Sequence, residues 1–223
     1  MNTFSLHFHQ EESLSLKLGF KKAESPRRKL ELKKAESPCR KLGLKNARYF
    51  CLAFFMQEDM MERLRIYRIS DKYVNYLHGV DNKVQFNKGA KRPYVGVVFK
   101  FGRHDYFVPM ESPKPNHAKI KPGKHIMKLD NGKLGMLGFN NMIPVHKDAL
   151  IEYDISKEKD MKYRNLLQRQ ISLCNKRKAD ILNHAQMTYF DVTSKTNKFL
   201  VKISCDFKKL ERASKNYNKD YKR

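Results

Sequence analysis

Short strand-like segments separated by tight turns occupy the middle of the chain, and this pattern is what most constrains the fold. Leu64–Ile69 alternates polar and apolar residues, and Tyr94–Phe99 is almost continuously apolar. Asp105–Val108 follows the second segment after the short connection Gly102-Arg103-His104. Two strand segments joined by a short glycine-containing connection are typical of a β-hairpin, whose strands run antiparallel. The pattern therefore predicts an antiparallel sheet.

A second hairpin is predicted farther along the chain. His125–Leu129 and Lys133–Leu137 flank Asp130-Asn131-Gly132, and the Asn131-Gly132 pair suits a type I′ turn. Asn141–Val145 and Ala149–Asp154 have the composition of two further strands.

Helix signals lie on both sides of the strand region. Ser70 is predicted to cap a short helix that Gly79 ends, and Asp206 to cap a final basic helix. Asp160 is predicted to cap a long helix, because apolar residues recur at helical spacing beyond it and neither glycine nor proline occurs up to about Phe190. Strands in the middle with helices at both ends predict an α+β protein with a curled antiparallel sheet.

The N-terminal part contains an internal repeat. The sequence KKAESP at Lys21–Pro26 recurs at Lys33–Pro38, and a degenerate third copy begins at Lys45, so the period is 12 residues. This period is shorter than that of repeats that stack into solenoids, and each copy has few apolar residues and at most one proline. We therefore expect residues 1–60 to be an extension without a folded core and residues 61–223 to form the functional domain.

The charge of the chain predicts a polyanionic partner. Lys and Arg number 47 against 23 acidic residues among 223, a formal charge of +24. Residues 1–60 contain 12 basic and 7 acidic residues (+5), which leaves 35 and 16 (+19) for residues 61–223. Nucleic acid is the leading candidate, because neutralising phosphates releases counterions, and an anionic membrane surface is second.

Several other classes of protein receive no support from the sequence. The first residues lack a basic segment followed by an apolar one, and Tyr49–Met56 is far shorter than the roughly 20 residues of a membrane-spanning helix. The cysteines form no CxxC pair and have no histidines at ligand spacing: Cys39, Cys51, Cys174 and Cys205. We expect a cytoplasmic protein without membrane contact, structural zinc or disulfide framework.

The first turns of the long predicted helix, Lys162–Gln170, have the character of an anion site. Basic side chains near a helix N-terminus oppose the helix dipole, so Lys162 and Arg164 are unfavourable there unless an anion also occupies the exposed N–H groups. Arg164 and Gln168 are four residues apart and share one face. The alternative is an ordinary amphipathic helix with a solvated basic face, which periodicity alone favours.

Two routes of phosphodiester chemistry are open to such a chain. A metal-dependent route needs clustered carboxylates, for which Glu152 and Asp154 on one predicted strand are the main candidates. A metal-free route to RNA cleavage uses the ribose 2′-hydroxyl as nucleophile, together with a proton acceptor, a proton donor and cations. Residues of the second kind occur on a proline-flanked turn and on the long helix: Ser112, Lys114, Lys162, Tyr163, Arg164 and Gln168.

In its motifs the chain resembles the ToxN/AbiQ family of endoribonuclease toxins, from type III toxin–antitoxin and phage abortive-infection systems. The resemblance covers Leu64 to about Tyr217, and within the family AbiQ is expected to be the nearer relative. The segments that carry it occur in the family's order: Arg65–Val74, Tyr94–Val98, Ser112–Lys114, Asn140–Val145, Lys162–Gln170 and Asp206–Leu210.

The resemblance implies a fold, an activity and partners. The fold is a compact α+β domain with a strongly bent antiparallel sheet and flanking helices, related to the MazF/Kid toxins. The activity is metal-independent cleavage of RNA, mRNA included, to a 2′,3′-cyclic phosphate, with no cofactor. The implied partner is a repeat-derived RNA antitoxin that forms an RNA-bridged complex with the toxin.

The resemblance also assigns residues to the site. The family's site residues carry over to Ser112, Lys114, Tyr163, Arg164 and Gln168. With Lys162 these form the predicted catalytic set, and the predicted RNA-binding set is Lys91, Arg92, Asn165 and Arg169. Two positions depart from the family pattern. Glu111 precedes the Ser-Pro-Lys turn where many members have threonine, and the loop before Gly96 has Arg92 in place of a lysine but lacks a tyrosine. The identity of the proton acceptor therefore stays open.

Two alternatives remain at the level of the sequence. Basic charge and aromatic side chains also suit an RNA-binding protein without catalytic activity. The repeat of 12 codons equals 36 nucleotides, and the resemblance implies tandem antitoxin repeats in the DNA just upstream of the toxin. Residues 1–60 are therefore interpreted either as translated antitoxin repeats or as a basic RNA-binding arm.

Overall fold

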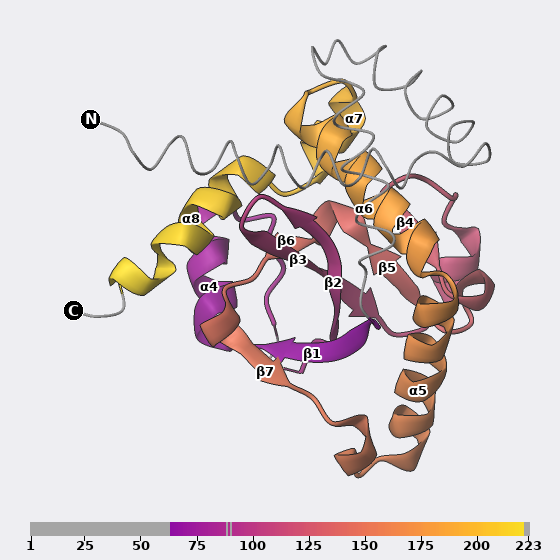
Figure 1. Ribbon diagram of the computed structural model, residues 1–223. Coiled ribbons are helices and arrows are strands. Elements are labelled where there is room, and N and C mark those ends of the chain that lie inside the picture. The colour runs from indigo at the N-terminus through magenta and orange to yellow at the C-terminus, as the bar shows by residue number, and fades with distance from the viewer. Residues whose placement is uncertain (1–62, 88, 90, 221–223) are drawn as a thin grey trace, which may run out of the picture. The chain divides into compact units, whose positions relative to one another are not determined.

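The computed structural model describes residues 63–87, 89 and 91–220, which belong to a unit spanning Glu62–Arg223 (Figure 1). The predictions for residues 1–60 lie outside the described residues. No helix in the described ranges is long and apolar enough to cross a membrane.

The described strands form one antiparallel sheet. Their order across the sheet is β4-β5-β3-β2-β1-β7, and β6 pairs with β3 off this path. The strands are β1 Arg65–Ile69, β2 Tyr94–Phe101, β3 His104–Glu111, β4 Ile126–Lys128, β5 Met136–Gly138, β6 Ile143–Pro144 and β7 Leu150–Glu152. The predicted α+β class with an antiparallel sheet is confirmed.

The hairpin at the centre of the sheet has the predicted strands. Gly102 has a φ of 57°, a left-handed conformation that favours glycine, at the connection between β2 and β3. The pairing register shifts between Val95 and Phe99 of β2, which marks a bulge. Figure 1 shows that strand direction turns through a large angle between β1 and the β4/β5 pair, so the sheet is strongly bent.

The second hairpin differs from the prediction in length. Asn131 and Gly132 both have positive φ, and the Lys133 N–H donates to the Asp130 carbonyl at 2.9 Å, as a type I′ turn requires. The strands, however, pair only from Lys128 and Met136 outwards. The turn therefore lies within a longer connection, Leu129–Gly135, and does not join the strands directly.

The helices begin largely where the sequence predicts. Ser70 caps α4 by accepting from the Tyr73 N–H at 3.3 Å, and Asp206 accepts from the Lys209 N–H at 3.0 Å at the start of α8. The helix after Ser70 continues one residue past Gly79. The helices are α4 Asp71–Val80, α5 Met161–Lys176, α6 Lys178–Thr193, α7 Lys198–Ile203 and α8 Phe207–Asp220.

The single long helix expected after Asp160 is wrong, because Arg177 interrupts it. Arg177 has φ −114° and ψ 28°, outside the helical range, and separates α5 from α6. Asp180 is an acidic residue in the first turn of α6, and its Oδ2 pairs with the Arg177 Nε at 2.9 Å. This local pair favours a new helix start without glycine or proline.

The core lies between the sheet and the helices α6 and α8. Aromatic rings of β2, β3 and both helices pack together there: Phe99, Tyr106, Tyr189 and Phe207. The hydroxyls of Tyr106 and Tyr189 donate to Glu211 Oε1 at 2.9 and 2.7 Å, and Lys208 Nζ lies 3.0 Å from Glu211 Oε2. A buried carboxylate with three such donors is satisfied and fixes α8 against α6.

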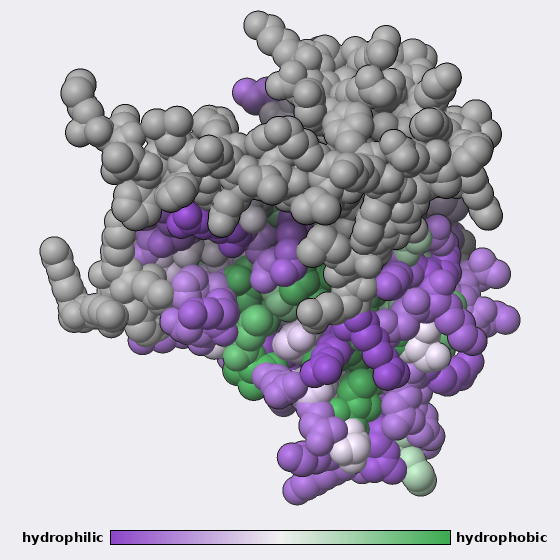
Figure 2. Space-filling model, in the orientation of Figure 1, coloured by the Kyte–Doolittle hydropathy of each residue, from purple (hydrophilic) through white to green (hydrophobic). Residues whose placement is uncertain are grey.

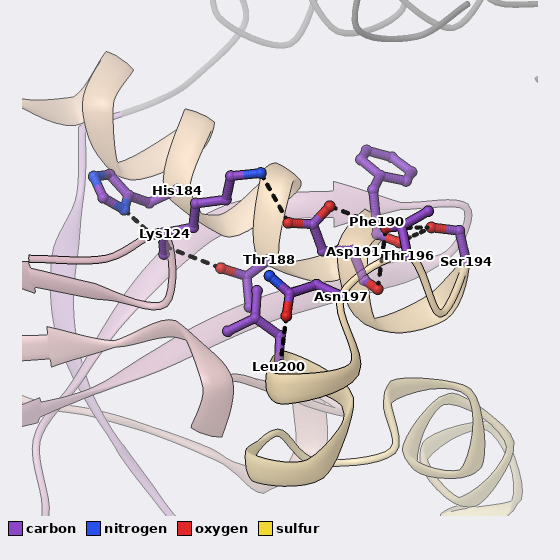
Figure 3. Close-up of polar contacts among 9 residues, drawn as sticks. All are labelled: Lys124, His184, Thr188, Phe190, Asp191, Ser194, Thr196, Asn197 and Leu200. Carbon is purple, nitrogen blue, oxygen red and sulfur yellow. Dashed lines mark hydrogen bonds and ion pairs between the residues drawn. The ribbon is translucent and has the colours of Figure 1, made fainter. Parts of the chain in front are cut away.

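Helix α6 also holds the segment that leads into β4. His184 Nδ1 and Thr188 Oγ1 donate to the Lys124 carbonyl at 2.7 and 3.1 Å, and Lys124 Nζ lies 3.0 Å from Asp191 Oδ2 (Figure 3). Both backbone and side chain of Lys124 are therefore tied to one helix. This anchoring fixes the position of β4 and of the connection that follows it.

Candidate active site

The Ser-Pro-Lys turn begins where β3 ends. Glu111 is the last residue of β3, and Ser112–Pro115 are exposed. The Lys114 ammonium donates to Glu111 Oε2 at 3.1 Å, with side chains 57% and 20% exposed. A partly exposed lysine held by a carboxylate is therefore the central feature of the turn.

His117 lies directly behind this pair. It belongs to the short 3-10 helix Pro115–Lys119, its side chain is 1% exposed, and its Nε2 lies 3.7 Å from Glu111 Oε2. The other ring nitrogen, Nδ1, is buried and has no hydrogen-bond partner. Sequence analysis missed the contact between Glu111 and His117, because nothing in the sequence indicates that a histidine six residues after Glu111 faces its carboxylate.

The Leu129–Gly135 connection lies between this turn and α5 and contacts both. Gly135 has a φ of 91°, and a Cβ there would lie 1.9 Å from the Glu111 carbonyl oxygen, so the two backbones touch. The neighbouring Leu134 carbonyl accepts from the buried Gln170 Nε2 of α5 at 2.6 Å. The connection is thus fixed on one side to the turn and on the other side to the helix.

A groove of about 850 Å³ lies between α5 and this connection. Three of the residues predicted to contact RNA line it: Asn165, Gln168 and Arg169. Its other lining residues are Lys128, Asp130, Asn131, Leu134, Ser172, Leu173, Lys176 and Arg177. Four basic side chains against one acid give the groove a net positive charge, which suits a phosphate backbone. Figure 2 shows that the surface of the region containing α5 is largely hydrophilic.

Two of the N–H groups at the start of α5, those of Lys162 and Tyr163, are already occupied by a carboxylate. The Asp160 carboxylate accepts from the Lys162 and Tyr163 N–H groups at 2.9 and 3.1 Å, and the Arg164 N–H donates to the Asp160 carbonyl. The expectation of an anion on these N–H groups is therefore wrong, because the N-cap carboxylate already fills them. The Lys162 side chain is exposed, so an anion near this residue would contact the side chain and not the N–H group.

Tyr163 and Arg164 lie in a separate polar cluster that sequence analysis missed. Arg164 Nη1 donates to the Glu158 carbonyl at 3.4 Å, and Tyr153 hydrogen-bonds to the Glu158 carboxylate. The Arg68 guanidinium lies over the Tyr153 ring, 4.4 Å from its centroid. Partial burial raises the pKa of Tyr163, which the charge of nearby Arg68 partly offsets. The Tyr163 hydroxyl therefore stays protonated at neutral pH.

Lys91 and Arg92 lie near the turn through the sheet. They precede β2, and the Met110 N–H donates to the Pro93 carbonyl at 2.9 Å, beside the end of β3. Lys91 is exposed, whereas Arg92 is half-buried with Nη1 donating to Gln85 Oε1 at 2.5 Å. Antiparallel pairing of β2 with β3 thus brings both basic residues to the same end of this strand pair as Ser112.

The predicted residues lie in four groups. Ser112 and Lys114 are on the turn, and Lys91 and Arg92 precede β2 beside the end of β3. Asn165, Gln168 and Arg169 line the groove on α5, and Lys162, Tyr163 and Arg164 lie in the first turn of that helix. Among the described residues no hydrogen bond or ion pair joins the turn to α5 directly. The connection Leu129–Gly135 lies between them.

The carboxylates considered as candidates for a metal-dependent route, Glu152 and Asp154, do not lie on one strand. Glu152 ends β7 and pairs with Arg65 at 3.5 Å, whereas Asp154 lies beyond the strand and caps a 3-10 helix at Ile155–Lys157. In the described ranges no group of three or more His, Cys, Asp or Glu side chains is arranged to hold a metal ion.

Comparison with known protein families matches residues 65–215 to the model described as "Toxin ToxN, type III toxin-antitoxin system". The chain belongs to the ToxN toxin family. The match covers both the Ser-Pro-Lys turn and α5, so the proposed site lies within the family domain.

Individual relatives support the same family. The chain is 36% identical over 162 residues to Endoribonuclease ToxN of Bacillus thuringiensis subsp. kurstaki, covering 69% of this chain and 84% of the relative. It is 29% identical over 178 residues to Endoribonuclease AbiQ of Lactococcus lactis subsp. lactis, covering 75% and 96%. Identity is therefore lower with AbiQ than with this ToxN, contrary to the nearness to AbiQ expected from the sequence.

Solved structures share the fold of this ToxN-family chain. One, from a study of toxin inhibition by a non-coding RNA pseudoknot in type III systems, matches with a TM-score of 0.63 at 36% identity, covering 70% of this chain and 99% of that one. The structure of AbiQ, described as a lactococcal anti-phage endoribonuclease, matches with a TM-score of 0.62 at 28% identity, covering 71% and 99%.

Proposed function

We propose that this endoribonuclease toxin of a type III toxin–antitoxin system cleaves RNA without a metal ion, through attack of the ribose 2′-hydroxyl on the adjacent phosphate. Its family and its relatives are those of endoribonuclease toxins in type III and anti-phage abortive-infection systems. The observation that carries the metal-free route is the exposed Lys114 on a turn that adjoins a positively charged groove. Cations of this kind stabilise the charge that develops on a phosphate.

The roles follow from the chemistry of the side chains. Lys114 and Arg164 hold the scissile phosphate, and Ser112 and Gln168 orient it. Tyr163, protonated at neutral pH, donates a proton to the leaving 5′ oxygen, with Lys162 beside it at the helix start. The flanking RNA is bound by four residues, two before the start of β2 and two on α5: Lys91, Arg92, Asn165 and Arg169.

The proposed restraint on this activity is an RNA antitoxin. An RNA partner is supported by the family and by the solved relative that a non-coding RNA pseudoknot inhibits. An antitoxin derived from tandem repeats would occupy the groove beside α5 and bridge toxin molecules. The phosphates of the antitoxin would contact the same basic side chains as those of the mRNA substrate. The two RNAs would therefore compete for one surface.

Cleavage is expected to survive an excess of EDTA, because the proposed site uses cations of side chains and no clustered carboxylates. The measurement is cleavage of a defined RNA by purified protein freed of bound RNA, with the product ends analysed for 2′,3′-cyclic phosphate. Loss of cleavage on chelation, restored by Mg²⁺, would contradict the metal-free route. Complete absence of cleavage with RNA binding intact would favour a non-catalytic RNA-binding protein.

For residues 1–60 we propose that the repeat reflects antitoxin DNA read in frame, and that the toxin made in the cell starts between Met56 and Met61. The in-frame period of 36 nucleotides and the modest charge of +5 support this proposal over a basic RNA-binding arm. Intact-mass measurement of the protein made from its native operon is expected to show a product that starts in this range. A product that contains residues 1–60 would contradict the proposal.

A further inference from the structure

The candidate site contains many proton donors and cations, and its carboxylates are Glu111 at the turn, Asp130 in the groove and Glu158 beside Arg164. RNA cleavage by the 2′-hydroxyl needs a group that is unprotonated at neutral pH and within reach of the ribose. Lysine and arginine are ordinarily charged at that pH, and the raised pKa of Tyr163 keeps its hydroxyl protonated. None of these groups is therefore suited to take the proton.

Two groups of the right chemical kind adjoin Lys114 on the Ser-Pro-Lys turn, Glu111 by direct contact and His117 by its contact with Glu111. The His117 side chain is 1% exposed, so substrate does not reach its ring. The Glu111 side chain is 20% exposed at the end of β3, immediately before the Ser-Pro-Lys turn. Accessibility therefore separates the two.

We propose that Glu111 is the general base of the cleavage reaction, with His117 as the residue that positions it. This inference rests on the proposed metal-free cleavage. Glu111 Oε2 is held between Lys114 Nζ at 3.1 Å and His117 Nε2 at 3.7 Å, one on its exposed side and one on its buried side. The backbone of the residue is fixed as well, because Gly135 touches its carbonyl oxygen.

The step balances as an acid–base displacement. The 2′ O–H bond breaks and its proton passes to the Glu111 carboxylate, while the 2′ oxygen forms a bond to phosphorus. The bond from phosphorus to the 5′ oxygen breaks, and that oxygen takes the proton of the Tyr163 hydroxyl. Lys114, which lies beside Glu111, neutralises phosphate charge next to the attacking oxygen. Water then returns both groups to their starting protonation states.

The decisive variant is Glu111→Gln, which keeps the shape of the side chain and removes its basicity. We expect kcat to fall by about 10²–10⁴-fold. Affinity for a 2′-O-methyl RNA, which lacks the reacting hydroxyl, is expected to be unchanged or higher, because a like charge near the phosphate is removed. Asp105→Asn is the matched control: Asp105 lies near the other end of β3 and pairs with Lys100 at 3.6 Å, and its kcat should stay at the wild-type value.

The pH profile separates a base from a merely structural acid. In the wild type, log kcat is expected to fall on the acidic side as the carboxylate becomes protonated, and this limb is expected to be absent in Glu111→Gln. The charged and titratable groups on the segments that pack around Glu111 are Arg92, Lys114, His117, Lys119, Asp130 and Lys133. His117→Gln keeps a polar side chain beside Glu111 and is expected to retain the limb.

An RNA with a 5′-bridging sulfur at the cleaved linkage gives an independent readout, because a thiolate leaves without a proton donor. This substrate is expected to restore the rate of Tyr163→Phe and not that of Glu111→Gln. Restoration of Glu111→Gln would contradict its assignment as the base.

Other outcomes also decide the proposal. Glu111→Gln with at least a tenth of the wild-type kcat, or with a higher kcat, would make Glu111 a restraint on Lys114 and overturn its role as the base. If Glu111→Gln does not fold, Glu111→Asp is used, and loss of its acidic limb would equally overturn it. Failure of the wild-type protein to cleave would contradict the proposed function itself, whereas cleavage that Glu111→Gln leaves intact contradicts only this inference.

Discussion

Lys114→Ala is expected to slow RNA cleavage by about 10²–10³-fold, the effect of removing one preorganised donor to a developing oxyanion. The Lys114 side chain is 57% exposed and contacts Glu111, which is itself partly exposed, so its loss leaves no buried group without a partner. The protein should therefore remain folded. Ser112→Ala is expected to lose less, because a hydroxyl orients the phosphate and carries no charge. Single-turnover cleavage rates and circular dichroism spectra measure the two effects.

A lysine in the same local setting provides the control. Lys157 pairs with Asp154 three residues before it, at 3.8 Å, as Lys114 pairs with Glu111. Lys157→Ala removes an equal charge from an exposed ion pair and is expected to leave the cleavage rate within about twofold, because exposed ion pairs contribute little. Equal rate losses in both variants would show that Lys114 acts only through the overall charge of the protein.

Gly135→Ala is expected to lower the free energy of unfolding by about 2–5 kcal/mol, the largest stability effect that we predict. The φ of 91° is unfavourable for an L residue, and the added Cβ would lie 1.9 Å from the Glu111 carbonyl oxygen. That atom belongs to the backbone, so relief requires the end of β3 to move. The displacement would also disturb Ser112 and Lys114, and cleavage should weaken together with stability. Urea unfolding measures the change.

Gly102→Ala separates backbone strain from the steric clash. Gly102 also has a positive φ, of 57°, but a Cβ there would meet nothing within 4 Å. It is therefore expected to lose only about 1–2 kcal/mol. If the two variants lose the same stability, then the close contact between Gly135 and Glu111 does not constrain the turn.

The sequence alone indicated most of the strands and the ends of the helices. Alternation in Leu64–Ile69 and the glycine after Tyr94–Phe99 predicted β1 and the central hairpin, because the pleat and the tight turn are local properties. Ser70, Asp160 and Asp206 predicted helix starts for the same reason, since a cap bonds only to N–H groups within its own first turn.

Where local signals were weak or competing, the sequence was misleading. The break at Arg177 occurs without a helix-breaking residue, and the Arg177–Asp180 pair beside it is not a signal that periodicity shows. The expected anion on the first N–H groups of α5 failed because the same Asp160 that predicts the helix start also occupies those groups.

The residues of the site were named from sequence motifs, but their neighbours were decided by the tertiary structure. Nothing in the sequence relates Gln170 to Leu134 or Gly135 to Glu111, contacts that hold α5 and the Ser-Pro-Lys turn on two sides of one connection. The pairing of β3 with β5 and the bend of the sheet set these distances, because they bring together segments that are far apart along the chain. The sequence by itself thus determined which side chains are available for phosphate chemistry. Only the fold decided that a carboxylate, Glu111, lies between the exposed Lys114 and the buried His117.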